Sequence, residues 1–237
     1  MRLEILSALN RERAARRIMM LVTDLENNEQ RLVVGGDAEK DEVARLGVER
    51  LQNGQDGVIV LHGRSYFLSV IRPPPRLVVI GAVHVAQALT TMARPAGFES
   101  IVIDPRSAFA TAERFPNVRL YAEWPDLVLA NIGLDRYTAV ACLTHDPKID
   151  DVALTMALRT GCGYVGALGS ARTHARRLDR LAKSGLDQDA LKRIHAPIGL
   201  DIGATSPAEI AVSILAEIML LWRHKPLRSD RIAAHLE

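Results

Sequence analysis

The chain has 237 residues, of which 48% are hydrophobic and 24% charged, and its formal net charge is +2. This length buries a substantial core and suits one large domain plus a small one. The near balance of charge excludes a general electrostatic affinity for nucleic acid or for a membrane surface. No apolar run approaches the length of a membrane span, and the N-terminus lacks the apolar core of a signal peptide. We therefore expect a cytoplasmic protein.

Three consecutive prolines at residues 73–75 divide the chain. Because proline fixes φ and lacks a backbone N–H, the run predicts a stiff spacer between a domain of residues 1–72 and a domain of residues 76–237. The first 72 residues predict a small α+β domain without recognisable chemistry. Its expected elements are helices at 3–17 and 38–52, strands at 17–24 and 31–35, and a hairpin of strands at 57–61 and 66–71.

After the prolines, strands and helices alternate at the spacing of βαβ units, which predicts a doubly wound, mostly parallel α/β sheet of Rossmann type. In such sheets ligands bind outside the carboxyl ends of the strands. The expected strands are 77–81, 100–104, 118–121, 138–143 and 163–167, and the expected helices are 83–94, 107–115, 149–160, 170–184, 188–194 and 207–223.

The first of these strands ends at Gly81 and leads directly into a helix. Free backbone N–H groups and the helix dipole make such a turn an anion site. The dinucleotide-binding fingerprint G-x-G-x-x-G/A reads here Gly-Ala-Val-His-Val-Ala. Val83 replaces the glycine that lets a pyrophosphate approach the backbone. The turn therefore predicts a ligand site beside His84 but disfavours the usual dinucleotide.

Polar side chains also follow two further strands. Asp104 lies roughly 20 residues beyond the first glycine, where a ribose-binding acid is expected, but an aspartate before proline also starts turns, here one that contains Arg106. His145 and Asp146 follow the strand at 138–143. They suit ligand binding, proton transfer or a purely structural pair. Their position at the carboxyl end of a strand favours the ligand-binding role, and no nucleophilic triad accompanies them.

A second glycine-rich turn follows the strand at 163–167 and contains Gly166, Gly169, Ser170 and Arg172. Ser170 is a candidate N-cap for the next helix. A helix N-terminus with an arginine in its first turn suits a phosphate better than the first turn does. We interpret the basic residues further along this helix as an ordinary solvated face.

The last loop is apolar and carries Asp201 two residues after Gly199. Its glycines indicate close backbone approach or positive φ, and its apolar character predicts burial against a ring system or a second subunit. Ser206, Pro207 and Glu209 together predict the start of the last helix: a cap, a proline at the first position and a capping-box acid. The two cysteines, Cys142 and Cys162 in the full sequence, show no metal-binding spacing and are expected to be reduced and partly buried.

In this order and spacing, the segments resemble the XdhC/CoxI family, accessory proteins of molybdenum hydroxylases such as xanthine dehydrogenase and carbon monoxide dehydrogenase. The resemblance runs from about Pro73 to Trp222. It rests on Pro-Pro-Pro-Arg-Leu-Val-Val-Ile-Gly-Ala-Val-His-Val-Ala at 73–86, Val-Ile-Asp-Pro-Arg at 102–106, Leu-Thr-His-Asp at 143–146, Tyr-Val-Gly-Ala-Leu-Gly-Ser at 164–170, Ile-Gly-Leu-Asp-Ile-Gly-Ala at 198–204 and Pro-Ala-Glu-Ile-Ala at 207–211.

The resemblance implies a protein that binds molybdenum cofactor, as molybdopterin or its dinucleotide form, and assists its sulfuration by a cysteine desulfurase. It also implies delivery to the apo molybdenum hydroxylase, a Rossmann-type C-terminal domain and a homodimer. The family's Gly-Ala-Gly-His has Val83 here, and the Gly-Ser-Ser-Pro-Arg-like segment and cysteine of the family's larger N-terminal domain are not found before Pro73. We therefore expect either a separate protein that carries this N-terminal domain or a partial function.

Two other interpretations compete with a cofactor-binding chaperone, which is favoured over an enzyme. An NAD(P)-binding oxidoreductase is suggested by the βαβ pattern and disfavoured by Val83 and by the missing Tyr-Lys or Cys-His set. The third interpretation is a non-catalytic interaction module. No metal ligand set is expected. The candidate cofactor-binding residues are Gly81, His84, Asp104, Arg106, His145, Asp146, Gly166, Gly169, Ser170, Arg172, Gly199 and Asp201.

Overall fold

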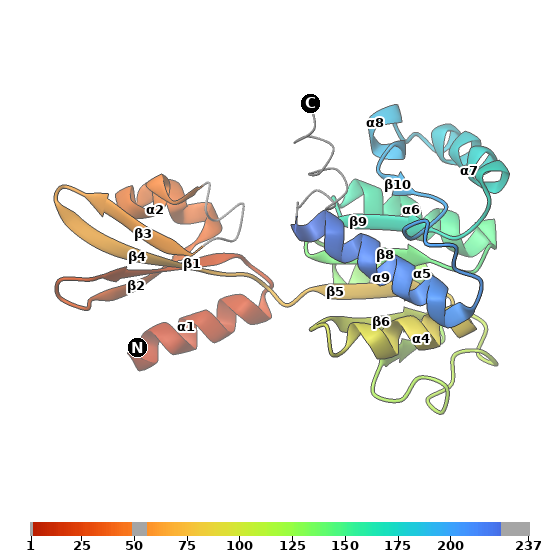
Figure 1. Ribbon diagram of the computed structural model, residues 1–237, viewed down its shortest axis with the longest axis horizontal. Coiled ribbons are helices and arrows are strands. Elements are labelled where there is room, and N and C mark those ends of the chain that lie inside the picture. Colours follow the sequence, from red (N-terminus) through yellow and green to blue (C-terminus); the bar gives the residue numbers. More distant parts are fainter. Residues whose placement is uncertain (1, 49–55, 224–237) are drawn as a thin grey trace. The chain divides into compact units, whose positions relative to one another are not determined.

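The computed structural model describes residues 2–48 and 56–223 (Figure 1). The chain divides into two compact units, residues 1–74 and 75–237, and each is described by itself. Part of the helix expected at 38–52 lies outside the described residues. No helix among the described residues is long and apolar enough to cross a membrane.

The first unit is a four-stranded antiparallel sheet with the order β2-β1-β4-β3 and helices beside it. One face of the sheet, with Met20 and Leu68, packs against Val43 and Ala44. Its elements are α1 (Leu3–Ala14), β1 (Met19–Asp24), β2 (Gln30–Val34), the 3-10 helix η1 (Gly35–Lys40), α2 (Glu42–Leu46), β3 (Gly57–Leu61) and β4 (Arg64–Ile71).

The helix expected from residue 38 is wrong at its start. The Asp41 side chain accepts a hydrogen bond of 2.9 Å from the Ala44 N–H and so caps α2, while the preceding residues form η1. An N-cap residue is itself non-helical, and the cap therefore separates the two short helices.

The second unit contains a six-stranded sheet with the order β10-β9-β8-β5-β6-β7, in which every pairing is parallel. This is the doubly wound Rossmann order, and it confirms the predicted fold class. The central strands β5 and β8 are buried on both faces, which is typical of continuous apolar strands in a parallel sheet. The strands are β5 (Arg76–Ile80), β6 (Glu99–Ile103), β7 (Arg119–Tyr121), β8 (Thr138–Cys142), β9 (Tyr164–Ala167) and β10 (Ile194–His195).

Helices cover both faces of this sheet (Figure 1). Val78 and Ile80 face a core shared with α5, α6, α7 and α8, whereas Leu77 and Val79 face a core shared with α4 and α9. The helices are α4 (His84–Ala93), α5 (Pro125–Ile132), α6 (Pro147–Arg159), α7 (Ala171–Lys183), α8 (Gln188–Leu191) and α9 (Pro207–Arg223).

Three elements of this unit differ from the prediction. Residues 107–115 form turns rather than a helix, because Arg114 donates hydrogen bonds to the Phe109 carbonyl and to Gln87 and so folds the segment onto α4. Helix α5 was not predicted, although Pro125 stands at its first turn. The two-residue strand β10 was not predicted either, because such a short strand carries no periodic pattern.

Candidate functional site

The candidate residues meet at the carboxyl edge of the Rossmann sheet. Ile80 pairs with Ile103 on one side and with Cys142 on the other, and Cys142 pairs with Ala167. The turns that follow β5, β6, β8 and β9 therefore lie next to one another. This is the edge at which open α/β sheets bind ligands.

The turn after β5 requires glycine for both conformation and space. Gly81 has φ +109°, and a Cβ there would lie 2.7 Å from the Thr144 Cγ2 atom. Val83 has extended backbone and packs against the core, and α4 then begins at His84 without a side-chain cap from any described residue. The His84 side chain is exposed. A helix start whose first amides lack a capping side chain suits an anion.

Asp104 is fully buried, and both its carboxylate oxygens accept hydrogen bonds within the protein. Oδ2 accepts from the Ala82 N–H at 2.8 Å and from Arg106 Nη2 at 2.8 Å, and Oδ1 accepts from the Arg106 N–H and Nε. Burial alone would raise the pKa of Asp104, but these hydrogen bonds outweigh it and lower the pKa. The carboxylate therefore holds Ala82 in the turn after β5 and Arg106 in its own turn. Of the two roles predicted for Asp104, this is the structural one.

The Arg106 side chain folds back onto Asp104. Its hydrogen bonds to Asp104 raise the pKa of Arg106, and the negative charges of Asp146 and Asp150 add a smaller effect in the same direction. Its guanidinium lies 4.6 Å from the centre of the Phe109 ring, and 39% of its side chain is exposed. A half-exposed guanidinium at the sheet edge is suited to contact an anion.

The turn after β8 is held by a buried carboxylate, Asp150 of α6. It accepts hydrogen bonds from Thr144 Oγ1 at 2.7 Å and from the His145 N–H at 3.1 Å. Burial raises the pKa of Asp150, and the hydroxyl of Thr144 and the charge of Arg177 offset this only in part. The His145 side chain is exposed, on a residue with φ +63°, and Asp146 caps α6 by accepting from the Lys148 N–H. His145 and Asp146 therefore do not form a pair with each other.

The turn after β9 combines a helix N-terminus with a buried arginine. Gly169 has φ +136°, and Ser170 caps α7 by accepting from the Thr173 N–H at 3.3 Å. Arg177 is only 2% exposed, and its Nη2 donates to the Leu168 carbonyl at 2.8 Å. Its Nε and Nη1 have no hydrogen-bond partner among the residues that the structure describes. Buried N–H groups of this kind are rare in folded proteins and indicate a bound water or ligand.

Sequence reasoning missed Arg177 because it interpreted all the basic residues after Arg172 on this helix as a solvated face. A helical wheel could have found it, since Arg177 stands four residues before the buried Leu181 and three after the half-buried His174. Arg172, which was singled out instead, is exposed, and its side chain makes no hydrogen bond with any described residue.

Gly166 and Gly199 are explained by packing. A Cβ on Gly166 would lie 2.6 Å from the Tyr164 hydroxyl, and a Cβ on Gly199, which has φ +93°, would overlap Ser213 Oγ of α9. The last loop is therefore buried in part against α9 of the same chain. Asp201 is exposed, and its side chain makes no hydrogen bond within the described part of the chain.

Glu217 of α9 fixes this loop. Its carboxylate accepts from the Tyr164 hydroxyl at 2.5 Å and from the Gly199 N–H at 2.9 Å, and it lies 3.3 Å from His195 Nδ1. Burial would raise the pKa of Glu217, but the bonds from His195, Tyr164 and Gly199 lower it. Glu217 could not be found from a local pattern because its partners lie far away along the chain.

The site offers anion-binding groups rather than metal ligands. Within residues 2–48 and 56–223, no three His, Cys, Asp or Glu side chains are placed to hold a metal ion. Cys142 and Cys162 are both fully buried, and burial raises the pKa of the Cys142 thiol and raises that of Cys162 to about 11. Both are therefore protonated thiols at neutral pH.

Comparison with known proteins identifies relatives of this chain. It is 33% identical to the uncharacterised protein YqeB of Escherichia coli over 188 residues, covering 78% of this chain and 33% of that protein. It is 33% identical to a protein of Bacillus subtilis described as a probable xanthine dehydrogenase subunit (71% of this chain, 51% of that protein). It is 31% identical to the molybdenum cofactor insertion chaperone PaoD of E. coli (65% and 42%). The chain thus spans about half or less of the length of these curated relatives.

A crystal structure of a xanthine dehydrogenase from Bacillus halodurans has the same fold, with a TM-score of 0.67 at 22% identity, over 98% of this chain and 70% of that one. The family model of the XdhC Rossmann domain matches residues 77–218, which include all the turns of the carboxyl edge. The chain therefore belongs to the XdhC family, through its Rossmann domain.

Proposed function

We propose that this chain binds molybdenum cofactor, as molybdopterin or its dinucleotide form, at the carboxyl edge of the Rossmann sheet, and that it serves the maturation of a molybdenum hydroxylase. The names of two relatives, a cofactor insertion chaperone and a probable xanthine dehydrogenase subunit, support this role. The observation that carries the proposal is the buried guanidinium of Arg177, with two nitrogens that have no partner among the described residues.

The residues present fit the cofactor's phosphate. Arg177 lies beneath the turn of residues 168–170, since a Cβ built on Gly169 would lie 3.7 Å from its Nη2. The same turn presents the N-terminus of α7, and α4 presents another helix N-terminus to the same edge. Two helix N-termini and a guanidinium form a cationic environment suited to a phosphate monoester or diester. In this proposal, Arg172 and Arg106, both exposed to solvent at least in part, close the anion site from outside.

The cofactor supplies the molybdenum centre that the hydroxylase uses, and this chain holds and protects it. The chain's two cysteines are buried, protonated thiols, so neither is suited to carry sulfur as a persulfide. We therefore assign the sulfur transfer to a cysteine desulfurase that acts directly on the bound cofactor. The protein's part in sulfuration is to position and shield the cofactor.

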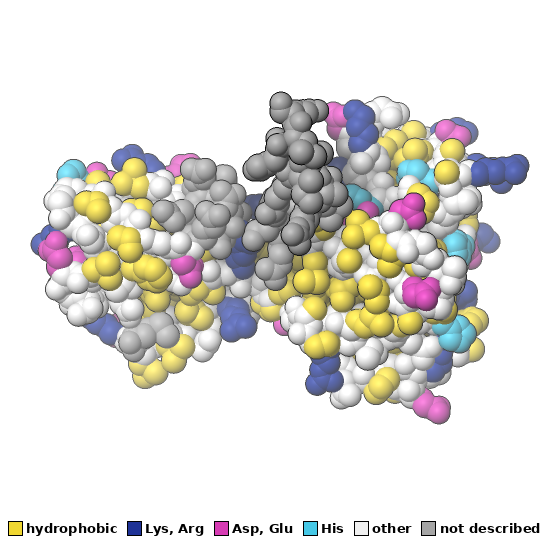
Figure 2. All heavy atoms as spheres, in the orientation of Figure 1, with side chains coloured by type: hydrophobic (Ala, Val, Ile, Leu, Met, Phe, Trp, Pro, Cys, Tyr) yellow, Lys and Arg dark blue, Asp and Glu magenta, His cyan; other side chains and the backbone are white. Residues whose placement is uncertain are grey.

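Two further partners belong to the proposal. A separate protein with the family's N-terminal domain would supply the cysteine segment that was not found before Pro73. A homodimer is supported by α9, where Val212 is 47% exposed and the neighbouring Leu215 and Met219 pack only in part against the core. Figure 2 shows hydrophobic side chains gathered over this helix. Light scattering on the purified chain measures its molar mass and so tests for the dimer. The variant Val212→Asp should be monomeric.

The NAD(P) interpretation finds less support. A ribose-binding acid must offer its oxygens to the ligand, whereas those of Asp104 already accept four hydrogen bonds from Ala82 and Arg106. Titration with NADH and NADPH tests this interpretation, and micromolar binding of either would favour it.

The maturation role is tested by co-expressing the chain with an apo molybdenum hydroxylase in a host that lacks the endogenous accessory protein. Arg177→Met should lower the fraction of active hydroxylase about tenfold, because it removes a charge-assisted contact. Arg176→Met is the matched control, since Arg176 is the exposed neighbour on the same helix. Equal hydroxylase activity with both variants would contradict the assignment of Arg177.

A further inference from the structure

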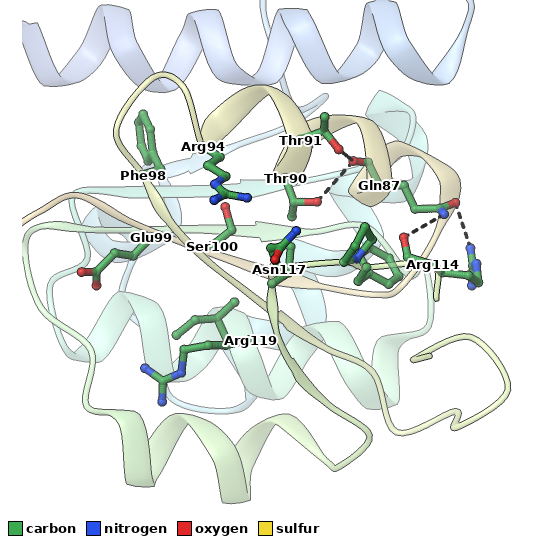
Figure 3. Close-up of a pocket in the computed structure, with 14 residues that line it drawn as sticks. Gln87, Thr90, Thr91, Arg94, Phe98, Glu99, Ser100, Arg114, Asn117 and Arg119 are labelled. Carbon is green, nitrogen blue, oxygen red and sulfur yellow. Dashed lines mark hydrogen bonds between the residues drawn. The ribbon is translucent and has the colours of Figure 1, made fainter. Parts of the chain in front are cut away.

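A separate cavity of about 560 Å³ lies beside α4, away from the carboxyl edge (Figure 3). Its volume is in the range of small-molecule sites. Ser100, the second residue of β6, lines the cavity, whereas Asp104 of the candidate site follows the last residue of that strand. The cavity is therefore at the opposite end of β6. It is lined by residues of α4 from Gln87 onward, by the C-cap residue Arg94, by the start of β6 and by residues 114–119.

The cavity has a structural origin. In a doubly wound sheet, the helix after the second strand normally packs beside the helix after the first. Here the connection from β6 to β7, which is described throughout, contains turns and no helix, so the flank of α4 is left uncovered. Hydrogen bonds between Gln87 and Arg114 hold the connection at one end of the hollow. The hollow is thus supported by specific contacts.

Three side chains of the lining carry hydrogen-bond donors: those of Arg94 and Asn117, which are exposed to solvent, and that of Ser100. The Arg94 side chain makes no hydrogen bond with any described residue, and neither does that of Asn117. The Ser100 hydroxyl is buried and also lacks a partner among the described residues. In Figure 3, Arg94, Ser100 and Asn117 point toward the same central space.

Other polar groups of the lining already have partners, and these include the exposed carboxylate of Glu99. Thr90 donates to the Ala86 carbonyl and Thr91 to the Gln87 carbonyl. Arg119 donates to the Tyr121 hydroxyl and points away from the centre. The lining also contains the buried rings and apolar side chains of Phe98, Ile101 and Phe115.

We propose that this cavity is a second binding site, which takes a small anion, a carboxylate or a phosphate ester, attached to a compact apolar group. A guanidinium, a hydroxyl and a carboxamide together donate to an anion, and the guanidinium supplies the opposite charge. The apolar side chains of Phe98, Ile101 and Phe115 contact the remainder of the ligand. The site is independent of the cofactor site proposed above.

The proposal is tested by calorimetric titration of the whole chain with phenyl phosphate, benzoate and inorganic phosphate. We expect saturable binding of phenyl phosphate or benzoate, and the tighter of the two identifies the acid group. Inorganic phosphate should bind at least about tenfold more weakly, because it lacks the apolar group. Amide chemical shifts of residues 87–94 and 117 should move on binding.

Variants locate the site. Arg94→Ala should weaken binding about tenfold, whereas Arg45→Ala, which removes an exposed arginine of α2, should change it less than about twofold. Ser100→Ala should also weaken binding without lowering the melting temperature, because the hydroxyl bonds no described residue. The proposal is overturned if neither organic anion shows saturable binding, or if Arg94→Ala binds them as tightly as the wild type. A melting temperature of Ser100→Ala below that of the wild type would also contradict it.

Discussion

Asp150 and Arg177 are buried opposite charges that hold adjacent turns of the carboxyl edge without bonding each other directly. Asp150 accepts hydrogen bonds from the turn after β8, and Arg177 donates to the Leu168 carbonyl in the turn after β9. The charge of Arg177 lowers the pKa of Asp150 against the larger effect of burial. The two turns are therefore coupled electrostatically through the protein interior, and this coupling leads to the first two predictions.

Replacement of Asp150 by alanine should destabilise the fold by about 2–4 kcal/mol. It leaves the Thr144 hydroxyl and the His145 N–H without an acceptor and removes the charge that faces the buried Arg177. Urea unfolding measures the effect. The matched control is Asp151→Ala, which breaks a partly exposed ion pair with Arg180 and should cost about 1 kcal/mol or less. Equal costs for the two variants would show that the buried carboxylate has no special role.

Asp150 also predicts a pH dependence. Its folded pKa is raised above that of the unfolded chain, about 3.9, so the native state binds the proton more tightly. The stability that this group contributes is complete below the unfolded pKa and is lost as the pH rises through the folded pKa. Asp150→Asn removes the titration. The stability of the wild type relative to this variant should therefore fall as the pH rises from about 4 to neutral, as measured by urea unfolding at several pH values, and a constant difference would refute the raised pKa.

Gly199 should tolerate alanine much less than Gly203. Both have positive φ, so alanine is strained by about 1–2 kcal/mol at each position. Only at Gly199 would the new Cβ overlap Ser213, which adds about 1–3 kcal/mol for overpacking, whereas no described atom lies within 4 Å of a Cβ on Gly203. Thermal unfolding of the two variants compares them. Similar melting temperatures would mean that the loop does not pack on α9 as described.

Glu209 should protect the start of α9 until strongly acidic pH. Its carboxylate accepts from the Ser206 and Thr205 N–H groups, which lower its pKa to about 2. The folded pKa is depressed, so the stabilisation is present above the unfolded pKa of about 4.3 and is lost as the pH falls toward 2. Melting temperatures of Glu209→Gln and the wild type should differ at about pH 6 and converge near pH 2. A difference that persists at the lowest pH would exclude this cap as its cause.

The sheet could be predicted well because its signals are local. Continuous apolar runs specify β5 and β8, and Ser206, Pro207 and Glu209 specify the start of α9. Residues 107–115 have helix-forming composition but are held as turns by Arg114. That contact with α4 depends on tertiary packing, which no local pattern reports.

The candidate site was predictable in place but not in detail. The turns could be located because parallel strands end at one edge, yet the roles of individual side chains depend on burial. From its sequence position, Asp104 resembles an acid that binds a ribose, but in the structure its carboxylate accepts hydrogen bonds from Ala82 and Arg106. Arg177 resembles its solvated neighbours and is buried. Only the folded chain distinguishes these cases.

Direct binding of the cofactor tests the central claim. The purified chain is titrated with molybdopterin and with its dinucleotide form, alone and together with a protein that carries the family's N-terminal domain. We predict saturable binding at one cofactor per chain, weakened about tenfold by Arg177→Met and unchanged by Arg176→Met. Absence of saturable binding under both conditions, or equal affinity of the two variants, would contradict the claim that the carboxyl edge holds the cofactor.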